Sequence, residues 1–130
     1  MSRTITKKDL SLLKRAKSFV HAGRGVIIFF KSTPNAWIHA LVFIGVITAG
    51  FYFSISRVEW LMLILTSAMV LAAEAFNTAF EVDIDLTSPQ FHPYARDTKD
   101  IAAGAVLITS LAAAVIGLII FAPYVMTAVY

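Results

Sequence analysis

Residues 74–100 read EAFNTAFEVDIDLTSPQFHPYARDTKD, and this stretch is the most informative part of the chain. Its first part lies at the end of a long apolar run, in which Glu74, Asn77 and Glu81 follow one another at i, i+3 and i+7. A helix places residues at this spacing on one face. Ionisable groups at membrane depth are costly and by default mark a functional site. Two carboxylates and an amide on one face therefore predict a site for chemistry at a membrane surface.

The three residues have different expected roles. A carboxylate removed from water holds a proton more strongly, so Glu74 is a candidate general base for a lipid alcohol. The alternative for Glu74 is an intramembrane hydrogen bond that fixes the pairing of two helices. Glu81 suits Mg²⁺, which binds through one or two carboxylates and substrate phosphates, although a solvated helix end has the same appearance. Asn77 either positions these carboxylates or packs within the bundle.

The polar residues that follow supply further candidates. Asp83 and Asp85 resemble the start of a calcium-binding loop, but the glycine and the terminal glutamate of such a loop are missing. Lys99 is suited to neutralising a phosphate, and Asp100 to capping a helix or holding a cation. His92, which precedes a proline, is more typical of a loop histidine than of a metal ligand.

The composition places this site in a membrane protein. The chain has 130 residues, of which 58% are hydrophobic and 15% charged, and its mean hydropathy is +0.77. A soluble domain would carry about 25% charged residues. The deficit is concentrated in three apolar stretches, which predicts an all-α integral membrane protein forming one domain over residues 1–130. The absence of cysteine excludes disulfides, thiolate metal sites and a cysteine nucleophile.

Membrane spans are predicted at about residues 36–53, 58–80 and 101–121. The third span is uncharged and rich in alanine and glycine, and small residues let helix backbones approach closely in lipid. We therefore expect it to pack against other helices, within or between chains. The polar connection 81–100 contains two prolines, so part of it should be irregular.

The N-terminal 31 residues carry eight of the 11 lysines and arginines. From Asp9 onward, apolar residues recur at helical spacing, which predicts an amphipathic surface helix over residues 9–30. Its charge indicates anionic lipid head groups as the partner rather than nucleic acid, because no basic stripe interleaved with stacking aromatics is present. The positive-inside rule places the N-terminus and the 81–100 connection at the cytoplasmic face, where nucleotide is available.

A family resemblance adds to this interpretation. The chain carries the pattern E-x-x-N-T-A-x-E-x-x-x-D over residues 74–85, then His92-Pro93, then K-D-x-A-A-G-A-V-L over residues 99–107. These motifs resemble the small membrane-embedded bacterial diacylglycerol kinase/undecaprenol kinase family, and the resemblance covers most of the chain. Asp85-Leu86, the A-A-G-A-V-L run and the segment 119–123 are more similar to the undecaprenol kinase branch.

The resemblance implies a homotrimer in the bacterial cytoplasmic (inner) membrane, with active sites shared between protomers. It implies that the γ-phosphoryl group of ATP is transferred, with Mg²⁺, to a lipid alcohol, undecaprenol or diacylglycerol. Glu74 would be the base and Glu81 a Mg²⁺ ligand. The nucleotide site would consist of Lys14, Glu81, Gln90, Phe91, His92, Lys99 and Asp100, and the lipid would lie along Asn35, Glu74, Asn77 and Ala103. Positioning and charge neutralisation dominate phosphoryl transfer, so the lack of a phosphate-binding loop motif is compatible with this chemistry.

Two departures from the family pattern K-T-E-x-N-x-R-I-H matter for the chemistry. In residues 31–39, Thr33 stands at the glutamate and Trp37 at the arginine. A hydroxyl is a weaker Mg²⁺ ligand than a carboxylate. Three readings follow: weaker metal binding, recruitment of another acid such as Asp83 or Asp85, or a degenerate member that kept the fold without kinase activity. The rival from another class is a non-catalytic membrane protein, either an assembly partner or a proton-linked transporter that uses Glu74.

Overall fold

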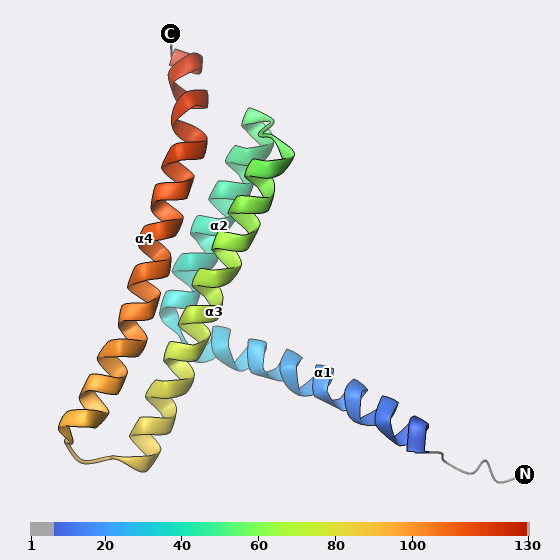
Figure 1. The fold of residues 1–130 in the computed structure, drawn as a ribbon, viewed down its shortest axis with the longest axis vertical. Coiled ribbons are helices and arrows are strands. Elements are labelled where there is room, and N and C mark those ends of the chain that lie inside the picture. Colours follow the sequence, from blue (N-terminus) through green and yellow to red (C-terminus); the bar gives the residue numbers. More distant parts are fainter. Residues whose placement is uncertain (1–6, 130) are drawn as a thin grey trace, which may run out of the picture. The chain divides into compact units, whose positions relative to one another are not determined.

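The computed structural model describes residues 7–129, which form four α-helices: α1 (Lys7–Ser32), α2 (Pro34–Phe53), α3 (Arg57–Thr87) and α4 (Pro93–Val129) (Figure 1). Helices α2, α3 and α4 are each long and apolar enough to cross a membrane. The prediction of an all-α protein with three long apolar helices is confirmed. The chain divides into two compact units, one ending at Thr33 and the other beginning at Pro34.

The first unit is a single long helix. Helix α1 ends at Ser32, and the backbone N–H of Thr33 donates to the carbonyl oxygen of Phe29 at 3.0 Å. The break falls at Thr33 because the residue before a proline is disfavoured in the helical conformation. Pro34 then opens α2, since the first helical position needs no N–H donor.

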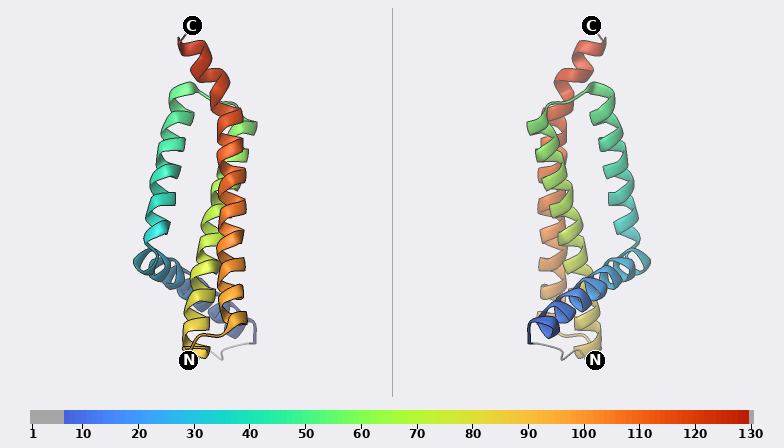
Figure 2. Two further views of the ribbon diagram at one scale, coloured as in Figure 1. Left: turned by 90° about the vertical axis from the view of Figure 1, so that its left-hand side faces the viewer. Right: turned by 90° about the vertical axis from the view of Figure 1, so that its right-hand side faces the viewer.

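In the second unit, α3 and α4 run antiparallel side by side, while α2 meets α3 near their shared turn and diverges toward Pro34 (Figure 2). The turn between α2 and α3 reverses the chain through Ser54, whose φ is 52°. Ser56 and Glu59 form a reciprocal capping box: the Ser56 N–H donates to Glu59 Oε2 at 2.7 Å, and the Glu59 N–H donates to Ser56 Oγ. The Tyr124 hydroxyl donates to the same Oε2 at 2.9 Å, which attaches α4 to the turn.

A small hydrophobic core lies at this end of the unit. It is built from Ile55, Leu63 and Ile120, with partly buried aromatic side chains packed around them. Elsewhere on α2, α3 and α4, large apolar side chains are exposed, including Leu41, Leu65 and Ile108. Outward-facing apolar side chains suit helices that lie in lipid or against other helices.

Two helices extend well beyond the predicted spans. Helix α3 continues past Phe80 to Thr87, and α4 begins at Pro93 rather than near Ile101. The connection outside helices is therefore limited to residues 88–92. The physical reason is that residues 81–87 contain no helix breaker, and Pro93 is compatible with the first turn of a helix. The additional turns of α3 carry Glu81, Asp83 and Asp85 in helical register.

We predict that Gly50→Ala destabilises the protein relative to Gly45→Ala. A Cβ at Gly50 would lie 2.7 Å from Trp60 Cη2 and 3.1 Å from Ile55 Cδ1, whereas a Cβ at Gly45 meets nothing within 4 Å. Both substitutions gain the same helix propensity, so their difference isolates the overpacking, about 1–3 kcal/mol. Thermal unfolding in detergent would measure this difference, and equal stability of the two variants would contradict the packing at Trp60.

Candidate active site

The polar face of α3 is the centre of the site. Glu74, Asn77, Glu81 and Asp85 lie within three turns on one side of the helix. Glu74 is 2% exposed and is the one buried charged side chain among residues 11–129. A carboxylate turned toward bulk lipid would be strongly unfavourable, so this enclosure is what a functional acid at this depth requires.

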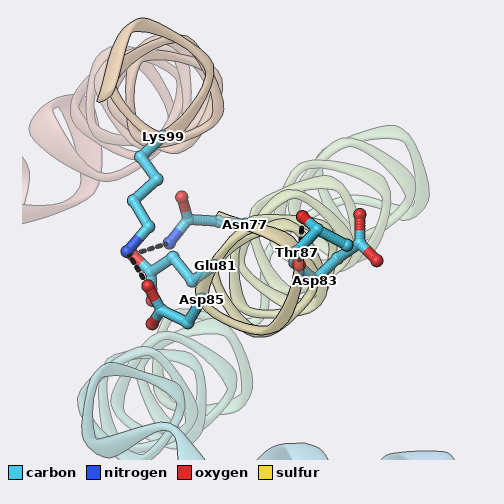
Figure 3. A network of polar contacts seen from close by, with 6 residues as sticks. All are labelled: Asn77, Glu81, Asp83, Asp85, Thr87 and Lys99. Atoms are coloured by element: carbon cyan, nitrogen blue, oxygen red, sulfur yellow. Dashed lines mark hydrogen bonds and ion pairs between the residues drawn. The ribbon is translucent and has the colours of Figure 1, made fainter. Parts of the chain in front are cut away.

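Asn77 links the buried and exposed parts of this face. Its side chain is 9% exposed, and its Nδ2 donates to Glu81 Oε1 at 3.2 Å (Figure 3). The Asn77 Oδ1 atom is buried without a hydrogen-bond partner. A buried acceptor without a partner is unfavourable in a resting protein, which indicates that a donor or a cation completes the site.

Helix α4 contributes a positive charge to the same face. Lys99 Nζ pairs with Asp85 Oδ1 at 2.5 Å, and Figure 3 shows the lysine reaching from α4 toward the side of α3 that carries Asn77 and Glu81. Asp83 points to the opposite side of α3, beside Thr87. Of the two aspartates considered in the sequence, Asp85 belongs to this network and Asp83 does not.

A small cavity of about 250 Å³ adjoins this network at the connection between α3 and α4. It is lined by four of the predicted nucleotide-site residues, Gln90, Phe91, His92 and Lys99. Asp85 and Arg96 also line it. Asp100, another predicted residue, is directed to Arg96, with 3.8 Å between its Oδ2 and the arginine Nε.

The remaining predicted residues lie outside this network. Lys14 belongs to α1 in the first unit, Asn35 lies in the first turn of α2, and Ala103 lies on α4, each with an exposed side chain. Within the described chain, the polar network therefore unites Asn77, Glu81 and Lys99 of the predicted set. Glu74 lies on the same face of α3, two turns from Glu81.

A second, larger groove of about 750 Å³ lies between α2, α3 and α4. Its lining is mostly apolar, and it includes the small residues Ala113, Ala114 and Gly117 of α4, together with Val70 and Leu71 of α3. Val70 and Leu71 come one turn before Glu74. The small residues of α4, expected to contact another helix, thus border an apolar space whose lining on α3 ends one turn before Glu74.

The structure shows two side-chain contacts that the sequence does not predict. The sequence suggests Asp85 as a ligand for a metal ion, whereas in the structure it is the partner of Lys99. Asp85 follows Glu81 at i+4, so a helix that continues past residue 80 places both side chains on the polar face of α3. No sequence pattern points to the hydrogen bond between Glu59 and Tyr124, because these residues are 65 positions apart.

Comparisons with known proteins show which family the chain belongs to. The model of the family described as prokaryotic diacylglycerol kinase matches residues 20–121. This chain belongs to that family. The family consists of lipid kinases, so the protein is an enzyme that phosphorylates a lipid, and its three apolar helices are those of a membrane protein.

Individual relatives cover much of the chain. An undecaprenol kinase from Bacillus subtilis is 39% identical over 107 residues, which are 82% of this chain and 87% of that protein. A diacylglycerol kinase from Synechocystis is 40% identical over 77% of this chain, which spans 58% of that protein. A diacylglycerol kinase from Helicobacter pylori is 27% identical over 77% of this chain and 84% of its own length. No solved structure matches the chain.

For this lipid kinase, we predict that Asn77→Ala lowers the rate of lipid phosphorylation by about 10–100-fold, the typical loss when a residue that orients a ligand carboxylate is removed. Glu81 would lose the amide that holds Oε1. Thr87→Ala is the control, because the Thr87 hydroxyl bonds to a backbone carbonyl on the other side of the same helix. Initial rates with purified protein would measure the effect, and equal rates for the two variants would contradict the orienting role.

Proposed function

We propose that this kinase transfers the γ-phosphoryl group of Mg·ATP to the hydroxyl of a long-chain prenol, undecaprenol, at the cytoplasmic face of a bacterial inner membrane. The observation that carries the proposal is the polar face of α3. A buried carboxylate, Glu74, lies two turns from Glu81, and Asp85, one turn further along, is paired with Lys99 of α4. This arrangement supplies a base, a metal-binding acid and a phosphate-binding cation without a nucleotide-binding loop.

The residues present fit a magnesium ion that takes few of its ligands from the protein. No group of three histidine, aspartate or glutamate side chains within residues 7–129 is arranged to hold a metal by itself. Mg²⁺ characteristically uses one or two protein carboxylates and takes its other ligands from phosphates and water. Glu81 would be that carboxylate, and the unpartnered Asn77 Oδ1 would accept from a bound water. When bound, the ion would neutralise charge on the transferred phosphoryl group.

The chain's own residues account for the rest of the chemistry. The lipid oxygen attacks the γ-phosphorus, the bond from that phosphorus to the bridging oxygen of ADP breaks, and the hydroxyl proton passes to Glu74. Lys99 donates hydrogen bonds to the phosphates. Gln90, Phe91 and His92 border the cavity beside Lys99 and would hold the nucleotide. Lys14 and Asp100 are assigned to nucleotide binding by the family resemblance alone. Positioning of this kind is the main source of rate in phosphoryl transfer.

The acceptor tail is assigned to the apolar groove between α2, α3 and α4. The groove passes Val70 and Leu71, so a chain lying in it would present its hydroxyl near Glu74. The family resemblance adds Asn35 and Ala103, which lie outside the lining of this groove, as further lipid contacts. Undecaprenol is the favoured acceptor because the chain matches 87% of the length of the relative named undecaprenol kinase. Diacylglycerol is the second candidate, supported by the 40% identity to a diacylglycerol kinase.

The proposed assembly is a homotrimer in which residues 1–130 act as one domain. The basic helix α1 would lie along the cytoplasmic membrane surface, with the N-terminus on that side. Large apolar side chains are exposed on all three apolar helices, which supports association with copies of the chain as well as with lipid.

Glu74→Gln is expected to reduce phosphoryl transfer by about 10²–10⁴-fold, because the amide cannot accept the hydroxyl proton. The measurement is transfer of label from γ-³²P-ATP to undecaprenol or diacylglycerol in detergent micelles. Glu59→Gln is the matched control, since glutamine preserves a capping box and Glu59 lies at the other end of α3. If Glu74→Gln retained the activity of the wild type while the oligomer was intact, the assignment of the base would be wrong. If the wild type labelled neither lipid, a non-catalytic member would be indicated.

Thr33→Glu is expected to lower the Mg²⁺ concentration for half-maximal activity, by about tenfold, because a carboxylate replaces a hydroxyl at the position where the family pattern has glutamate. Thr33→Gln is the control, since it has the same length without the charge. Thr33 is only 7% exposed, so the oligomeric state of both variants must be compared with the wild type. An equal Mg²⁺ requirement for the glutamate and glutamine variants would exclude a metal-binding role for this position.

A further inference from the structure

The ion pair between Asp85 and Lys99 joins the polar ends of α3 and α4 across the connection at residues 88–92. The two residues are 14 positions apart, so the contact is made by the tertiary structure. The Lys99 side chain is 34% exposed and that of Asp85 is 68% exposed. Lys99 is thus directed onto the polar face of α3, while its partner remains accessible to water.

Nearby acids are arranged so that Asp85 is the partner of Lys99. On α4, Asp97 and Asp100 approach Arg96 Nε, at 4.0 Å and 3.8 Å. On α3, Asp83 points to the opposite side of the helix (Figure 3). Arg96 is therefore paired with carboxylates of its own helix, whereas Lys99 is paired with Asp85 on the face of α3 that also carries Glu81.

We infer that Asp85 is a positioning residue: it holds the Lys99 ammonium at the cavity and gives it up when a polyphosphate binds. An exposed ion pair of this kind contributes little to stability, so it is readily exchanged. A polyphosphate offers several charged oxygens to the three N–H donors of a lysine and competes well against one carboxylate. The inference rests on the proposed function in one respect, namely that the polyphosphate is the kinase's nucleotide.

This arrangement has two opposite effects that can be separated. Asp85 competes with phosphate for Lys99, so its removal should tighten nucleotide binding. Asp85 also restricts a flexible four-carbon side chain, so its removal should leave Lys99 less well placed in the transition state. For Asp85→Asn, KM for Mg·ATP and kcat should therefore both fall, about threefold and about tenfold. Simple loss of folded enzyme would lower kcat alone.

The kinetic experiment compares three variants with undecaprenol and Mg·ATP in detergent micelles. Asp85→Asn should show the joint decrease, and Asp85→Glu, which keeps the charge, should restore both values toward those of the wild type. Asp83→Asn is the matched control, because it removes the same carboxylate two residues away on the other side of α3. Asp83→Asn should behave as the wild type does.

A second readout reports on the lysine without requiring catalysis. An amine-acylating reagent is applied to the full-length protein, and the peptide that contains Lys99 is quantified by mass spectrometry. Acylation of Lys99 should be several-fold faster in Asp85→Asn than in the wild type and unchanged in Asp83→Asn. Addition of Mg·ATP should slow acylation in both the wild type and Asp85→Asn, because phosphate replaces the carboxylate as the partner.

The outcomes are distinct. Equal acylation rates and equal kinetic constants for Asp85→Asn and Asp83→Asn would overturn the inference. A raised Mg²⁺ requirement in Asp85→Asn, with KM for nucleotide increased, would overturn it in favour of a metal ligand. If the wild type transferred no phosphate to lipid, the proposed function would fail, but the acylation rates would still decide whether Asp85 holds Lys99.

Discussion

One carboxylate, that of Glu74, lies enclosed in an apolar bundle, and this enclosure governs how α3 is oriented. A charge cannot be left facing lipid, and Glu74 is 2% exposed on a helix whose other buried residues are leucine, valine, threonine and asparagine. Enclosing Glu74 requires α3 to turn one face away from lipid along its length. Asn77, Glu81 and Asp85 then take their positions from the helical register of that face, and Lys99 of α4 meets Asp85 there.

The two ends of α3 are held by different interactions, and the site lies at the end with less packing. Near residues 54–60 the chain is fixed by a capping box, by the Tyr124 hydroxyl and by the Ile55, Leu63 and Ile120 core. At the other end, α3 and α4 are joined by an exposed ion pair beside a small cavity. Stable packing at one end thus positions a polar end that water can reach. Such a division suits the proposed kinase, whose acceptor would be in the membrane and whose phosphate donor would be in water.

Many features of the fold followed from residue pattern alone. Long apolar runs predict membrane helices because each backbone polar group in lipid must be paired within its own segment. Pro34 placed the break at Thr33, and the spacing of Glu74, Asn77 and Glu81 placed them on one face. The predicted membrane spans do not give the limits of α3 and α4, because hydropathy reports where lipid ends and not where a helix ends. Residues 81–87 are polar enough to leave the membrane and still remain helical.

The class of the protein, the acidic face of α3 and the motifs shared with prokaryotic lipid kinases can be read from the amino-acid sequence, since all three depend on local spacing and composition. Three contacts cannot be read from it: Asp85 rather than Asp83 meets Lys99, Tyr124 reaches Glu59, and small residues of α4 border an apolar groove. The physical reason is that these contacts depend on how two helices face each other. The rotation of one helix against another is set by packing over their whole length, which no short stretch of sequence records.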